Sequence, residues 1–165
     1  MAETLEYKAE LAVLKFIETE ELDALADYSY HAGGKFQQQE PPCVCVFFTG
    51  MQEAWDNAAP QNVSLSVEIV TLLDPDGDDD GIAGKQDDRL ANASAHRAAV
   101  KAVRDLLQDE ASLQAFANET NVTDRPVSAF YIYAINDIAT RSTAVEDRVI
   151  CTSIGVTLVC EEQDN

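Results

Sequence analysis

The sequence predicts an α+β fold of two layers, in which a four-stranded, mainly antiparallel sheet carries two or three helices on one face. Two segments repeat apolar residues at helical spacing, and four segments rich in β-branched or aromatic residues lie between and after them. The expected order is α-β-β-α-(α)-β-β. Helix–strand–strand, repeated twice, buries one face of a sheet under its helices.

The first expected elements are a helix over Glu3–Tyr28 and a strand over Cys43–Thr49. Apolar residues of the helix recur at helical spacing, with Glu and Asp between them. Gly33-Gly34 ends this stretch, and Pro41-Pro42 prevents a restart. The run Cys-Val-Cys-Val-Phe-Phe-Thr is typical of a short strand that is buried on both faces. The residues Gly50–Gln61 are expected to form a loop.

Val63–Leu73 is the clearest strand, because Val, Leu and Ile alternate with Ser and Glu along it. A period of two predicts one buried face and one wetter face. An acidic loop insertion at 74–88 follows and overlaps the start of a second helix over Asp87–Gln108. Apolar residues line one side of that helix, and basic residues lie mainly on the other side. Ala111–Ala117 adds a helical turn.

The C-terminal third supplies the last strands. Val127–Ile135 is rich in Tyr and Phe, as strands tend to be. The polar residues 136–147 are expected to form a loop or arm. Arg148–Cys160 closes the fold as a long strand whose even-numbered residues are mostly apolar, and the acidic tail 161–165 is expected to fray. The length suits a single domain over residues 1–165.

The composition restricts the classes of function. The net charge of −19, from 11 basic and 30 acidic side chains, argues against wrapping nucleic acid and against binding anionic membranes. No apolar stretch reaches the roughly 20 residues of a membrane span. The N-terminus does not have the basic start and apolar run of an export signal. The cysteines are therefore expected to be reduced and to pack as small buried hydrophobes: Cys43, Cys45, Cys151 and Cys160.

The acidic loop holds the strongest chemical motif. Asp76, Asp78 and Asp80 alternate with other residues, Gly81 follows, and Asp87 ends the pattern. Alternating carboxylates on a glycine-turned loop are the hard oxygen ligands that calcium prefers. The element before the loop is a strand rather than a helix, and the last position is Asp rather than the longer Glu. The loop is either a solvated acidic insertion or a calcium site.

Catalytic signatures are missing from the sequence, which predicts that the protein is not an enzyme. It contains no nucleophile elbow, no paired-histidine metal motif and no phosphate-binding glycine loop. Trp55, in the loop between the first two strands, serves either loop packing or an interface. Arg141 and Arg148 bracket a polar segment, where they either pair with nearby carboxylates or contact a neighbouring subunit.

Five segments, taken in order after the leading helix, carry a resemblance to a known family. They are Cys43–Thr49, Val63–Thr71, Ala93–Leu107, Val127–Tyr133 and Arg148–Val159. In their order and patterning they resemble the tail terminator proteins of long-tailed bacteriophages, the lambda-type minor tail protein family. The resemblance covers most of the chain and rests on elements rather than on a catalytic signature.

The resemblance implies a structural virion protein, made in the host cytoplasm and placed at the neck of the tail. Such proteins form a homo-oligomeric ring, usually a hexamer, on the end of the tail tube. The ring stops tube polymerisation and joins the tube to the head connector. DNA passes through the ring without specific contacts, and no cofactor or membrane is involved. The alternatives are another head–tail connector or completion protein, and a calcium-binding module that uses the loop Asp76–Asp87.

Overall fold

The computed structural model describes residues 5–33, 39–52, 61–73, 81–119, 130–146 and 148–162. The helices are α1 (Leu5–Thr19), α2 (Gly81–Leu107) and α3 (Glu110–Glu119), with a short 3-10 helix, η1 (Asp23–Leu25). The strands are β1 (Ser29–Ala32), β2 (Cys43–Gln52), β3 (Gln61–Leu72), β4 (Phe130–Glu146) and β5 (Val149–Glu162). Among the described helices, none is long and apolar enough to cross a membrane.

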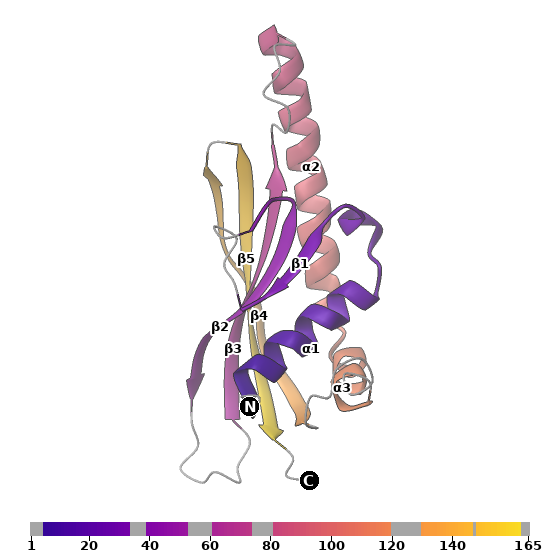
Figure 1. Ribbon diagram of the computed structural model, residues 1–165, viewed down its shortest axis with the longest axis vertical. Coiled ribbons are helices and arrows are strands. Elements are labelled where there is room, and N and C mark those ends of the chain that lie inside the picture. Colours follow the sequence, from indigo (N-terminus) through magenta and orange to yellow (C-terminus); the bar gives the residue numbers. More distant parts are fainter. Residues whose placement is uncertain are drawn as a thin grey trace.

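The strands form one sheet in the order β1-β2-β3-β5-β4. β1 runs parallel to β2, and all the other neighbours are antiparallel. Helices α1, α2 and α3 lie on the same side of this sheet (Figure 1). The predicted α+β arrangement of two layers is therefore confirmed. The sheet gains a fifth strand at its edge, because the short β1 was not expected from the sequence.

The alternation of residues in β3 and β5 separates the two faces of the sheet. The apolar residues of both strands point toward the helices and are almost completely buried: Val63, Leu65, Val67, Ile69, Ile154, Val156 and Leu158. The residues between them are small or polar and lie on the second face. The helices close the core from the other side, where the rings of Phe16 in α1 and Phe116 in α3 lie 5.6 Å apart. The predicted core patterning of both strands is confirmed.

The first helix is shorter than the predicted Glu3–Tyr28, because α1 ends at Thr19. Glu21 has a φ of 48°, a left-handed backbone conformation that often ends helices. The chain then turns into η1, and Leu22 just before it and Leu25 within it still pack against the core. Their apolar spacing therefore imitates a continuing helix.

The second helix begins earlier than expected, at Gly81. Residues 81–88, assigned above to the acidic loop insertion, are helical, and residues 74–80 of that insertion lie outside the described residues. The helix packs on the sheet through His96, Ala99, Val103 and Leu107, which are spaced by three or four residues. The polar sequence of its first turns gave no apolar stripe from which the start could be predicted.

The prediction of a loop or arm over residues 136–147 is wrong, because residues 136–146 belong to β4 and pair with β5. The fraying predicted for residues 161–165 is also wrong at its start, because Glu161 and Glu162 pair with Tyr131 and Phe130 of β4. The register of β4 shifts three times, at Tyr133, Asn136 and Arg141. Each shift breaks the alternation of a regular strand, so the sequence does not show the period of two.

The expected loop Gly50–Gln61 is also shorter, because β2 continues to Gln52 and β3 begins at Gln61. β2 contains a register shift between Phe48 and Gly50. Past the end of β1, the carboxylate of Glu10 in α1 accepts the Phe48 backbone N–H at 2.8 Å. A buried helix side chain thus takes the place of a strand partner for β2.

Candidate functional site

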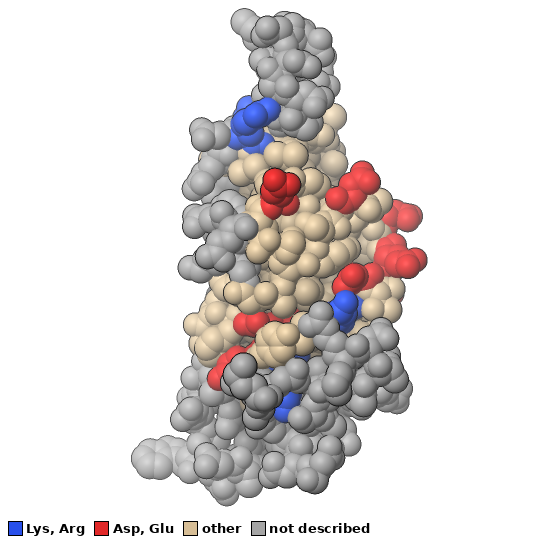
Figure 2. Space-filling model, viewed as in Figure 1, with Lys and Arg blue, Asp and Glu red and all other residues tan. Residues whose placement is uncertain are grey.

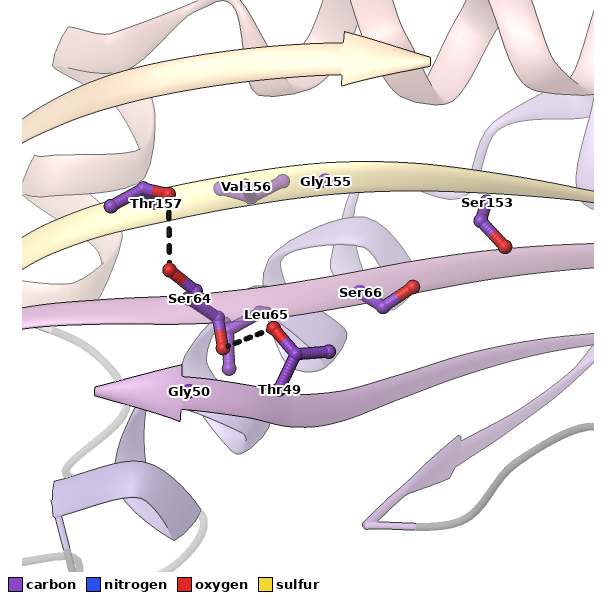
Figure 3. A pocket seen from close by; sticks show the side chains of 9 residues that line it. All are labelled: Thr49, Gly50, Ser64, Leu65, Ser66, Ser153, Gly155, Val156 and Thr157. Carbon is purple, nitrogen blue, oxygen red and sulfur yellow. Dashed lines mark hydrogen bonds between the residues drawn. The ribbon is translucent and has the colours of Figure 1, made fainter. Parts of the chain in front are cut away.

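The described helices leave the second face of the sheet uncovered. The helices contribute to one core cluster only, together with the opposite face of the strands. On the second face, residues of β2, β3 and β5 line a hollow of about 440 Å³ (Figure 3). Its lining is Thr49, Gly50, Ser64, Leu65, Ser66, Ser153, Gly155, Val156 and Thr157.

The hollow is built from small and hydroxyl-bearing residues. The Ser64 and Thr157 hydroxyls join β3 to β5 at 3.3 Å, and Thr49 Oγ1 donates to the Ser64 carbonyl at 3.1 Å (Figure 3). Ser66, Ser153 and Gly155 complete a surface without any titratable side chain. This lining offers neutral hydrogen-bond donors and acceptors and close approach to the backbone. It is suited to packing against another protein surface rather than to acid–base chemistry.

The other end of the second face is apolar and closed. Cys43, Cys45 and Val70 are fully buried there with Cys151, and the carboxyl group of Glu68, opposite Cys45, is buried beside these apolar side chains. The Cys43 and Cys45 sulfurs lie 3.8 Å apart. Their hydrogen bond raises the pKa of the Cys45 thiol and lowers that of Cys43, and burial disfavours both thiolates. The prediction of free, buried cysteines is confirmed.

His96 is buried on the helix side and is held by hydroxyl groups. Its Nδ1 lies 2.7 Å from Thr71 Oγ1, and its Nε2 lies 2.7 Å from Thr152 Oγ1. The Tyr28 hydroxyl extends this hydrogen-bond network, because it bonds the Thr71 hydroxyl. Desolvation, with a smaller contribution from Arg97, lowers the pKa of His96 to about 4. A neutral imidazole thus connects α2 to β3 and β5.

The predicted site residues are not brought together. Trp55, Asp76, Asp78 and Asp80 lie outside the described residues. Asp87 lies in the second turn of α2, so the second half of the predicted calcium loop is helical. The described part of the chain contains no group of three or more potential metal ligands. Calcium binding stays a prediction.

The two predicted interface arginines lie at different parts of the β4–β5 hairpin. Arg141 occupies a register shift in the middle of β4, at the outer edge of the sheet. Arg148 is exposed in the turn that leads into β5. Register shifts are common in edge strands, where they hinder uncontrolled pairing with other sheets. Sequence reasoning missed the hollow itself, whose signal is the Ser, Gly and Thr at alternate positions of β3 and β5.

No known protein-family model and no curated protein matches this chain.

Proposed function

We propose that this protein is a structural component of a phage tail, forming a ring that caps the tail tube and joins it to the head connector. The ring would end tube polymerisation and let DNA pass through its lumen. The proposal rests on the order and patterning of the elements that resemble tail terminators. It takes support from one feature of the fold, the uncovered second face of the sheet.

That face is suited to assembly for a physical reason. The hollow is lined mainly by Ser, Thr and Gly, and the side chains of Leu65 and Val156 are buried in the core on the helix side, so another backbone can approach closely. Hydroxyls can satisfy a partner's polar groups without the desolvation cost of a charge. The long edge strand β4 borders the same sheet. A surface and an edge of this kind are typical of subunits that pack side by side.

The charge of the chain agrees with a DNA conduit. With a net charge of −19, subunits around a lumen would repel the phosphate backbone and would not hold it.

A tube elongation assay tests the proposal. Tail tubes are grown from their tube protein, and the chain is added at increasing ratios. We expect elongation to stop at substoichiometric amounts, because one ring suffices for one tube end. The double variant S66R/S153R fills the hollow and should lose this effect. A111R, on the exposed side of α3, is the control that should retain it. Unchanged tube lengths with the wild-type chain would refute the proposal.

A further inference from the structure

Basic side chains are concentrated on one exposed stripe of α2. Leu90, Arg97 and Arg104 are spaced by seven residues, which places them within about 40° of each other around the helix. Lys101 lies one turn after Arg97 on the same side. The stripe is about 21 Å long from Leu90 to Arg104, and Leu90 is 64% exposed. With only 11 basic residues in the chain, this helix carries an unusual share of them.

A second surface has the opposite charge and lies where α1 gives way to η1 and β1. It is a hollow of about 320 Å³ whose inner lining is Leu22 and the buried Leu25, with Ala26, Tyr28 and Tyr30 beside them. Three carboxylates lie at its rim, on Glu18, Glu21 and Asp23. Figure 2 shows the acidic side chains gathered over this corner of the molecule. The hollow is therefore apolar inside and negative at its rim.

Each surface keeps charged side chains that form no salt bridge within the described part of its own subunit. No residue of α2 lines the acidic hollow. In the described part of the chain, Arg97 and Arg104 form no salt bridge, and Glu21 and Asp23 form none either. Lys101 pairs with Asp105 on its own helix, and Glu18 pairs with Lys15 on α1. The arginines and the rim carboxylates are thus available to a partner of opposite charge.

We propose that the stripe Leu90–Arg97–Lys101–Arg104 of one copy docks into the acidic hollow of the next copy. Leu90 then contacts the apolar inner lining, and Arg97, about 10 Å further along the helix, meets the rim carboxylates and stacks against the tyrosines. Arg104 extends the positive charge along the helix past the edge of the hollow. A contact between two different surfaces of identical chains is heterologous, and repeating it produces a ring or a filament. This inference rests on the proposed function, for which it supplies the contact between subunits. Figure 1 shows the N-terminal turns of α2 rising past the end of the sheet, while the rest of the helix lies alongside it.

Reciprocal charge reversal tests this contact. The variant R97E/R104E makes both surfaces acidic, and E21K/D23K makes both basic. We expect each variant to be monomeric in analytical ultracentrifugation at concentrations where the wild-type chain assembles. Their equimolar mixture should assemble again, as should a chain with all four changes, because the charges are then complementary. E40K, an exposed carboxylate that neither lines the hollow nor lies on α2, should assemble like the wild type. Thermal unfolding of every variant checks that it is folded.

The outcomes separate this inference from the function on which it rests. Assembly that survives both reversals would overturn the contact but leave a ring formed through other surfaces. Loss of assembly without rescue in the mixture would also overturn it, because complementary charge would not be the cause. A wild-type chain that stays monomeric at millimolar concentration and low salt would contradict the contact as well. In each of these cases the tube elongation assay would still test the proposed function independently of this contact.

Discussion

At the scale of single residues, His96 shows how a polar side chain is accommodated in this core. It is 1% exposed, and both ring nitrogens have a hydroxyl within hydrogen-bond distance. The neutral ring can donate from one nitrogen and accept at the other, so both are satisfied without a charge. A protonated ring would have to be buried as a cation. The network therefore stabilises the fold only while His96 is neutral.

We expect the H96Q variant to be less stable at neutral pH, and the difference from wild type to shrink in acid. The folded-state pKa of about 4 lies below the ordinary value of 6.5, so between these values the unfolded chain binds the extra proton. The stabilisation by His96 is complete above pH 6.5 and is lost as the pH falls toward 4, at most about 3 kcal/mol. Urea unfolding at a series of pH values measures this, with H31Q as the control that should follow wild type.

Glu10 supplies a second prediction. Its carboxylate accepts the Phe48 N–H, while burial and then the nearby charge of Glu6 raise its pKa despite that bond. E10A should cost about 1–3 kcal/mol of unfolding free energy at pH 7, because the buried N–H loses its acceptor. E10Q keeps an oxygen in place without the charge and should cost much less. Chemical denaturation of both, beside the exposed E20A, measures the difference. Equal losses in E10A and E10Q would contradict this role.

At the scale of elements, regular patterns were predicted well and irregular ones were not. β3 and β5 pair in one unbroken register, so their extents and helix-facing residues could be read from the sequence, whereas the burial of Val70 and Cys151 on the second face could not. In β4 each register shift adds one residue that has no partner in β5. As a result, isoleucines three residues apart in β4 lie opposite β5 residues that are two apart and face the helices. These isoleucines are Ile132, Ile135 and Ile138, opposite Cys160, Leu158 and Val156. The strand predicted over Val127–Ile135 therefore covers only the first part of β4, because a spacing of three does not continue the period of two of a regular strand.

Two other elements depend on contacts that a local pattern does not contain. β1 has only four residues and exists because it pairs in parallel with Cys43–Val46 of β2. The hollow on the second face combines residues from three strands, which become neighbours only after the sheet has formed. In the sequence of a single strand, small polar residues at alternate positions indicate only a solvent-facing side. That β2, β3 and β5 place them side by side follows from the strand order.

Hydrogen–deuterium exchange tests the assignment of β4. Amides of residues 137–146 should be protected in those positions that bond to β5, to a degree comparable with β5 itself. An unpaired arm over the same residues would exchange completely within seconds. The comparison should be made at concentrations where the chain is monomeric, because a neighbour could otherwise protect the edge strand.

Calcium binding at the acidic loop is tested by calorimetry. If Asp76, Asp78, Asp80 and Asp87 hold the ion, millimolar calcium should release or absorb heat and should raise the melting temperature. D78N should remove both effects, while D105N, an exposed carboxylate elsewhere on α2, should retain them. No heat and an unchanged melting temperature in the wild type would leave the loop as a solvated acidic insertion.

At the scale of the whole molecule, the fold divides its surfaces by chemistry. The helices bury one face of the sheet, the second face presents neutral hydroxyls, and charge of opposite sign gathers on α2 and on the corner beside η1. A monomer that works alone has no need for such a division. A subunit of a ring requires one surface for each neighbour and others for the tube and the connector.

Electron microscopy of the purified chain mixed with tail tubes tests the central proposal most directly. The proposal predicts a ring of added density at one end of each tube, coaxial with it and open along the axis. The S66R/S153R variant should leave the ends bare, and A111R should cap them as the wild type does. Density along the sides of the tubes, or tube ends that stay bare with the wild-type chain, would contradict the proposal.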